Sequence, residues 1–186
     1  MNLANRLTIF RIFLTPLFAA ALVYYSSERI LLYWVGTGIF ALACLTDALD
    51  GYVAAKMNQK TVLGSYIDPI ADKLLLLSGY VCLGFLTHLP PTMKVPAWLT
   101  ILVISRDILI VLGSMVIFVM TGALKARPLF VGKLTTVLQM ATLLASLLML
   151  PELFREVLFG ITGLLTVVTG FLYVKIGSQA LQGSGK

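Results

Sequence analysis

Histidine and cysteine are nearly absent from this sequence of 186 residues. It contains one histidine, His88, and two cysteines, Cys44 and Cys82, which lie far apart in the chain. A catalytic site that needs a pair of histidines is therefore excluded, as is a metal site with several histidine or closely spaced cysteine ligands. We expect both cysteines to be small buried side chains, and His88, beside two prolines, to lie in a loop.

Charged side chains are also scarce. Only 12% of the residues are charged, whereas 59% are hydrophobic. A soluble globular domain has about 25% charged and roughly 45–50% apolar residues, so an ordinary soluble domain is excluded. Several segments approach the length of about 20 apolar residues that spans a bilayer. We count six: 7–26, 30–56, 68–90, 96–121, 132–150 and 154–176. The sequence therefore predicts an all-α integral membrane protein with a six-transmembrane-helix bundle, formed as a single domain by residues 1–186.

The two ends of the chain differ from these spans. Polar and apolar residues alternate at near-helical spacing from Asn2 to Arg11, which predicts an N-terminal interfacial helix over residues 1–11. Residues 177–186 end in the sequence LQGSGK, which is polar and rich in glycine and serine. We therefore expect a flexible tail there.

The basic residues are unevenly distributed. Nine of them lie at the amino end, in the second and fourth predicted loops or at the carboxyl end: Arg6, Arg11, Lys56, Lys60, Lys125, Arg127, Lys133, Lys175 and Lys186. Only three lie on the other side: Arg29, Lys94 and Arg155. Because cytoplasmic loops carry an excess of lysine and arginine, we expect both termini to be cytoplasmic, as in a bacterial inner membrane protein. Arg11 falls inside the first span and is expected to snorkel to the interface. The net charge of +6 thus matches membrane lipids and phosphorylated substrates, and no nucleic-acid partner is expected.

Half of the eight acidic residues lie in one short segment on the predicted cytoplasmic side, residues 47–72. If both halves of this segment are helical, each carries a stripe of acidic and small residues, because side chains three or four positions apart share a helix face. The first stripe is Asp47, Asp50, Gly51 and Ala54, and the second is Gly64, Asp68 and Asp72. The sequence between them is long enough to reverse the chain. We therefore expect the four carboxylates to converge near the cytoplasmic end of the bundle.

Such convergence needs a compensating positive charge. Each charged group inside a span costs about 2.5–3.5 kcal/mol, and like charges repel. Two divalent cations, Mg²⁺ or Mn²⁺, would offset this cost because they prefer oxygen ligands. The small residues beside the acids leave room for an extended ligand, so the pattern predicts a metal-dependent site for a diphosphate. Two alternatives stay open: Asp68 could be the N-cap before Pro69, and membrane carboxylates also serve ion-coupled transporters.

The spacing of these residues resembles the signature of the CDP-alcohol phosphatidyltransferase family, D-x₂-D-G-x₂-A-R-x₈₋₉-G-x₃-D-x₃-D. The likeness extends over nearly the whole chain and includes the amino-terminal sequence NRLTIFR. It implies a homodimeric membrane enzyme that binds two divalent metal ions. Such an enzyme displaces CMP from a CDP-linked lipid, here CDP-diacylglycerol, with an alcohol.

Carried over to this sequence, the resemblance assigns a role to each acidic residue. Asp47, Asp50 and Asp68 are implied to be metal ligands. Asp72 is implied to complete the metal site and to act as the general base for the acceptor hydroxyl. The residues implied to line the cytidine diphosphate pocket are Gly51, Ala54 and Gly64.

One position departs from the signature. Its arginine falls at residue 55, which is Ala55 here, with Lys56 beside it. This departure puts nucleotide affinity or full activity in question. A non-catalytic member that binds nucleotide lipid weakly is therefore a third alternative.

A second group of charges predicts where the acceptor alcohol binds. Arg106 lies beside Asp107 in the fourth predicted span, and Arg127 and Lys133 lie around the start of the fifth. We interpret Arg106, Arg127 and Lys133 as acceptor-binding residues; the alternative is a snorkelling pair with ordinary cytoplasmic charges.

This region most resembles CMP-forming cardiolipin synthases and phosphatidylglycerophosphate synthases. The latter often carry a second arginine eight residues after the first, where this chain has Ser114. Fewer cations suit a phosphodiester acceptor, which favours phosphatidylglycerol over glycerol 3-phosphate. Inositol and serine stay open.

Overall fold

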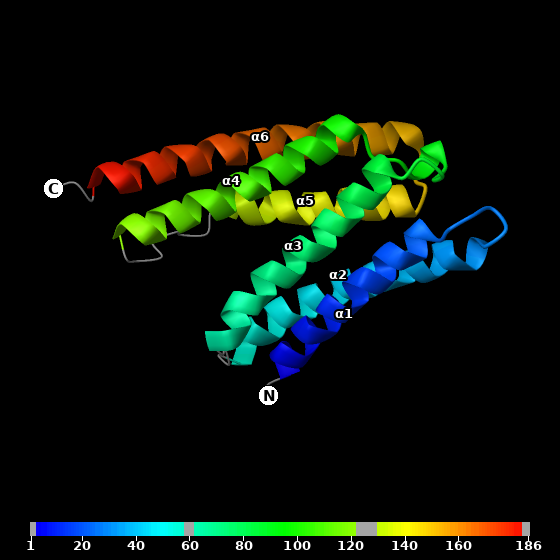
Figure 1. The fold of residues 1–186 in the computed structure, drawn as a ribbon, viewed down its shortest axis with the longest axis horizontal. Helices are drawn as coiled ribbons and strands as arrows, with labels where there is room; N and C mark the ends of the chain where they lie inside the picture. Colours follow the sequence, from blue (N-terminus) through cyan, green and yellow to red (C-terminus); the bar gives the residue numbers. More distant parts are fainter. Residues whose placement is uncertain (1–2, 58–61, 122–129, 184–186) are drawn as a thin grey trace. The chain divides into compact units, whose positions relative to one another are not determined.

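The computed structural model describes residues 3–57, 62–121 and 130–183, without the side chains of 3–7, 48–57, 62–70, 72, 116–118, 120, 121 and 180–183. The described residues form helices joined by short connections and contain no strand. Six α-helices are present in this part of the chain: α1 (Leu3–Val23), α2 (Ile30–Met57), α3 (Val62–Phe85), α4 (Ala97–Thr121), α5 (Phe130–Leu147) and α6 (Glu152–Gly183). One turn of 3-10 helix, η1 (Pro91–Met93), precedes α4. The predicted all-α fold and the number of helices are confirmed (Figure 1).

Four of these helices are long and apolar enough to cross a membrane. Within the described residues, the apolar stretches that meet this condition are Ile30–Asp47, Pro91–Met115, Phe130–Leu147 and Glu152–Gln179. Helices α1 and α3 contain shorter apolar stretches, Thr8–Val23 and Lys73–Phe85. In α3 the acidic residues Asp68 and Asp72 precede the apolar part, which shortens it. The chain is therefore an integral membrane protein by composition and length, and the count of six spans stays a prediction.

The ends of the first and last helices differ from the sequence-based expectation. Residues 3–23 form one continuous helix, with Pro16 inside it, so no break separates an interfacial helix from the first predicted span. An interfacial position for its first turns stays a prediction. Helix α6 continues to Gly183, into the segment 177–186 that was expected to be a flexible tail. Glutamine, alanine and leucine in that segment are good helix formers, which explains the extension.

The contacts divide the chain into two compact units, which are described separately. The first contains residues up to Val95 together with Leu143–Leu150, and the second contains Pro96–Thr142 and the residues from Pro151 onward. In the first unit α1 packs against both α2 and α3 (Figure 1). Phe18 of α1 contacts Phe40 of α2, with ring centroids 5.3 Å apart.

The connections of the first unit are held by polar contacts to helix ends. The Tyr33 hydroxyl donates to the Leu147 carbonyl at 2.7 Å, and His88 Nε2 lies 2.9 Å from the Leu22 carbonyl oxygen. His88 therefore has a structural role after α1. Met149 has a φ of 49°, and its amide and that of Leu150 bond back to the carbonyls of Ser146 and Ala145. This Schellman motif ends α5, and Pro151 follows it.

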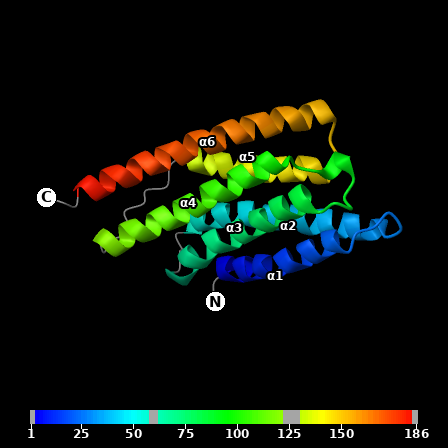
Figure 2. The same cartoon turned by 45° about the horizontal axis from the view of Figure 1, so that its top comes forward.

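In the second unit α4 and α6 lie side by side (Figure 1 and Figure 2). The close approach depends on Gly163 of α6, where a Cβ would lie 2.7 Å from the Trp98 ring of α4. Small residues commonly allow helices to approach in membrane proteins. The second unit therefore brings the charged residues of α4 against α6.

Candidate functional site

The predicted metal ligands lie on two helices that follow one another in the chain. Asp47 and Asp50 lie near the end of α2, and Asp68 and Asp72 lie in the first half of α3. The helical spacing assumed for both stripes is therefore present. The structure does not describe the side chains of Asp50, Asp68, Asp72 and Ala54, nor the surroundings of Gly51 and Gly64. Convergence of the carboxylates stays a prediction.

Asp47 forms an ion pair that links α2 to α1. Its Oδ1 lies 3.0 Å from Nη1 of Arg11, and the exposed fractions of the two side chains are 30% for Asp47 and 1% for Arg11. The expectation that Arg11 snorkels to the interface is wrong, because its guanidinium is enclosed and paired. Buried charges are retained where they are paired and hydrogen-bonded. Arg11 thus holds one carboxylate oxygen of a predicted metal ligand in place.

The Asp47 side chain fits a divalent metal site. It offers a hard oxygen ligand, and its partial exposure leaves it accessible to an ion. Carboxylates that bind metals are usually held by a second hydrogen-bonding group, which Arg11 would supply here. Among the side chains that the structure describes, no group of three ligands forms a metal site, but three of the four predicted ligands are not in that set.

The predicted acceptor residues belong to the second unit, and the structure describes two of them. Arg106 of α4 is 6% exposed, and its Nη1 donates to Asp107 Oδ1 at 2.7 Å. Its guanidinium carbon lies 5.6 Å from the centroid of the Tyr173 ring of α6. The Lys133 side chain is exposed near the start of α5. Arg127 lies outside the described residues.

One buried donor of Arg106, its Nε–H, has no hydrogen-bond partner among the described residues. A buried donor without a partner costs free energy, so an acceptor atom on a bound ligand would stabilise this arginine. Asp107 neutralises the charge of the guanidinium, so this pair suits a weakly charged or neutral group better than a doubly charged one.

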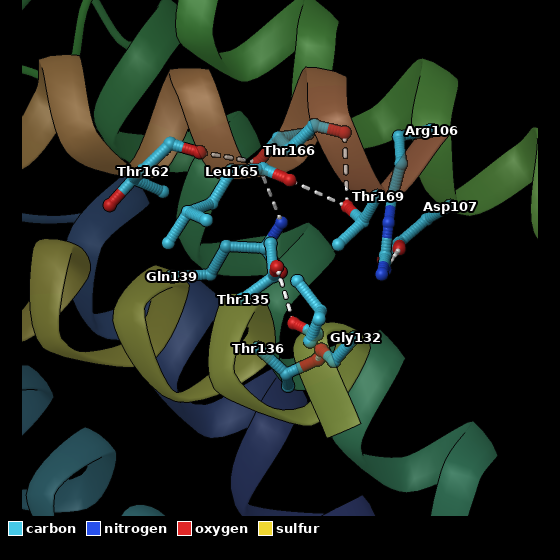
Figure 3. A network of polar contacts seen from close by, with 11 residues as sticks. Arg106, Asp107, Gly132, Thr135, Thr136, Gln139, Thr162, Leu165, Thr166 and Thr169 are labelled. Atoms are coloured by element: carbon cyan, nitrogen blue, oxygen red, sulfur yellow. Dashed lines mark hydrogen bonds and ion pairs between the residues drawn. The ribbon is translucent and has the colours of Figure 1, made fainter. Parts of the chain in front are cut away.

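A row of buried polar side chains joins α5 to α6 and ends near Arg106 (Figure 3). The Thr142 and Thr162 hydroxyls are 2.8 Å apart, and Gln139 Nε2 lies 3.4 Å from the Thr166 hydroxyl. We call this row the polar seam: Thr135, Gln139, Thr142, Thr162, Thr166 and Thr169, each at most 1% exposed. The polar seam was not among the features predicted from the sequence. Its signal was the spacing of three polar residues at i, i+4 and i+7 on each helix.

Comparison with known proteins identifies related sequences. A family model described as CDP-alcohol phosphatidyltransferase matches residues 1–172. A probable phosphatidylglycerophosphate synthase of Mycobacterium tuberculosis is 34% identical, over 93% of this chain and 80% of the relative. The CMP-forming cardiolipin synthase of Homo sapiens is 28% identical, over 97% of this chain and 63% of the relative. The CDP-diacylglycerol–glycerol-3-phosphate 3-phosphatidyltransferase of Bacillus subtilis is 32% identical, over 98% of both chains. Relatives with two different acceptors are thus similar to this chain.

Proposed function

The chain belongs to the CDP-alcohol phosphatidyltransferase family, and from this premise we propose that it transfers the phosphatidyl group of CDP-diacylglycerol to phosphatidylglycerol. The products are cardiolipin and CMP. The family assignment makes the chain a membrane-bound transferase of phospholipid biosynthesis that uses a CDP-linked lipid and an alcohol. The observation that supports phosphatidylglycerol is the charge balance around Arg106. Its guanidinium is paired with Asp107, and Ser114 stands where a second arginine would add charge.

The second candidate acceptor is glycerol 3-phosphate. It is supported by the names of the Mycobacterium tuberculosis and Bacillus subtilis relatives. Glycerol 3-phosphate carries a phosphomonoester with up to two negative charges, whereas phosphatidylglycerol carries a phosphodiester with one. The Arg106 guanidinium is neutralised by Asp107, and Ser114 adds no charge, so this part of the site suits the singly charged group.

The four aspartates of α2 and α3 divide the chemical work. Asp47, Asp50, Asp68 and Asp72 would hold two divalent ions, Mg²⁺ or Mn²⁺, on which the family generally depends. When bound there, such ions would neutralise charge on the diphosphate and on the departing CMP. Asp72 accepts the proton of the acceptor hydroxyl, whose oxygen then bonds to the phosphatidyl phosphorus while the bond from that phosphorus to the CMP oxygen breaks. Arg11 orients Asp47, and the small residues Gly51, Ala54 and Gly64 leave space for cytidine diphosphate.

The reaction is tested by CMP release from CDP-diacylglycerol by the purified protein. We expect release with Mg²⁺ or Mn²⁺ when phosphatidylglycerol is added, little release with glycerol 3-phosphate, and none after chelation. Asp72→Asn should remove turnover and leave a folded protein, because the amide cannot accept the proton. Release driven only by glycerol 3-phosphate would select the second candidate. No release with any alcohol would indicate binding or transport by the carboxylates instead.

Two further variants belong in the same assay. Lys133→Ala should raise the KM for the acceptor and leave the KM for CDP-diacylglycerol unchanged, since Lys133 is proposed to bind the acceptor. Ala55→Arg restores the signature arginine. If Ala55 weakens nucleotide binding, this variant lowers the KM for CDP-diacylglycerol. A homodimer with its acidic site and both termini on the cytoplasmic side completes the proposal.

A further inference from the structure

The polar seam sets the register between α5 and α6. Thr142 contacts Thr162, and Gln139 contacts Thr166. From the first pair to the second, the position moves three residues back along α5 and four residues forward along α6, as expected for antiparallel helices. Two turns further on, the same register places Gly132 of α5 opposite Tyr173 of α6. All these residues belong to the second unit. The seam contacts and the contact of Gly132 with Tyr173 therefore share one register between α5 and α6.

The Tyr173 side chain packs closely against the backbone of Gly132. A Cβ built at Gly132 would lie 2.8 Å from the Tyr173 hydroxyl oxygen, and 3.4 and 3.5 Å from the ring carbons Cε2 and Cζ. Only the contact with the hydroxyl is too short for a real Cβ, since the other two are ordinary van der Waals distances. The end of the tyrosine side chain thus rests on the backbone of α5 because residue 132 has no side chain.

The same ring faces Arg106. The guanidinium carbon lies 5.6 Å from the ring centroid, within the range of a cation–π contact. The stem of Arg106 lies against Gly170, where a Cβ would be 3.8 Å from Arg106 Cγ. Arg106 is thus held at its stem by α6, at Nη1 by Asp107 and at its face by Tyr173. Among the buried nitrogen atoms of Arg106, Nε–H has no partner in the described residues.

We infer that Tyr173, seated on Gly132, is a positioning residue that orients the Arg106 guanidinium toward the phosphate of the acceptor alcohol. The inference rests on the proposed function, in which Arg106 contacts the acceptor. Tyr173 itself makes no contact with the substrate in this scheme. Its role is to restrict the guanidinium to one orientation, so that the hydrogen-bond donor is preorganised before the acceptor alcohol binds.

Compensating substitutions test this arrangement. Gly132→Ala displaces the Tyr173 ring, and we expect the KM for the acceptor to rise by up to about thirtyfold, which corresponds to the loss of a desolvated cation–π contact. Tyr173→Phe keeps the ring and should be near wild type. The double variant Gly132→Ala with Tyr173→Phe should return to the wild-type KM, because only the hydroxyl obstructs the new methyl group. The KM for CDP-diacylglycerol should stay unchanged in all three.

The controls separate this inference from the proposed function. Gly160→Ala, on the same helix as Tyr173, adds a Cβ with no atom within 4 Å and should change neither KM. Thermal unfolding, which needs no substrate, provides a second readout. The melting temperature should fall in Gly132→Ala and recover in the double variant. An active wild type whose acceptor KM ignores Gly132→Ala, or fails to recover in the double variant, overturns the inference alone. An unchanged acceptor KM in Arg106→Ala overturns the inference and the acceptor role of Arg106. A wild type that releases no CMP overturns the inference and the proposed function together.

Discussion

Arg11 shows how a cation inside an apolar helix can serve a polar site. Its position in the first span favoured a side chain that extends to the interface, yet the side chain is enclosed and paired with Asp47. The choice between these two outcomes depends on which face of α1 meets α2. That face is set by packing between helices, which the sequence of α1 alone does not specify. A buried arginine near an acidic motif is therefore a candidate partner of the motif.

The Arg11–Asp47 pair predicts a measurable contribution to stability. Replacing Arg11 by alanine leaves Asp47 without its charged partner, so we expect the free energy of unfolding to fall by about 1.5–3 kcal/mol. Arg11→Lys should recover part of this loss. The measurement is denaturant unfolding of the detergent-solubilised protein.

The matched control for this prediction is Arg29→Ala. The Arg29 side chain is exposed, so its removal should change the free energy of unfolding by less than about 0.5 kcal/mol. If Arg11→Ala is no more destabilising than Arg29→Ala, the pair does not stabilise the fold.

At the scale of helices, the polar seam predicts coupling between α5 and α6. Hydrogen bonds between membrane helices contribute about 0.6 kcal/mol on average. We therefore expect Thr142→Val and Thr162→Val to show a coupling free energy of about that size in a double-mutant cycle of unfolding. Thr136 serves as the control, since its hydroxyl bonds to the Gly132 carbonyl of its own helix. Coupling between Thr136→Val and Thr162→Val that equals the first value would argue against a specific seam.

The same scale shows what the sequence could predict. Apolar runs of about the length of a membrane span predicted six helices, and six are present in the described part of the chain. The length of a run is a local property, so it is readable from the chain. The contact of Gly132 with Tyr173 joins residues on different helices, and its register depends on the seam. Contacts of this kind follow from packing, which periodicity does not determine.

The candidate site also combines features that the sequence predicts with features that only the structure shows. The spacing of Asp47, Asp50, Asp68 and Asp72 could be read as two helical stripes because helix periodicity is local, and both segments are helical. The role of Arg106 as a charge near the acceptor was also a sequence prediction. The partners that constrain Arg106, namely Tyr173 and Gly170, come from α6 and required the structure.

For the whole molecule, the distribution of basic residues predicts the orientation in the membrane. With nine basic residues on one predicted side and three on the other, the loops near Arg29 and Lys94 should face away from the cytoplasm. After replacement of Cys44 and Cys82 by serine, single cysteines can report each side. Suitable exposed positions are Ser27, Thr92 and Ser178.

In intact bacterial cells, a membrane-impermeant maleimide should label Ser27→Cys and Thr92→Cys, and it should label Ser178→Cys only after permeabilisation. The reason is that Ser27 and Thr92 lie in loops predicted to face away from the cytoplasm, whereas Ser178 lies near the cytoplasmic carboxyl end. CMP release by each variant shows that the labelled protein is correctly folded. The reverse labelling pattern would place the acidic residues of the segment 47–72 on the outer face, away from a cytoplasmic supply of nucleotide-linked lipid. It would contradict the proposed orientation of the site.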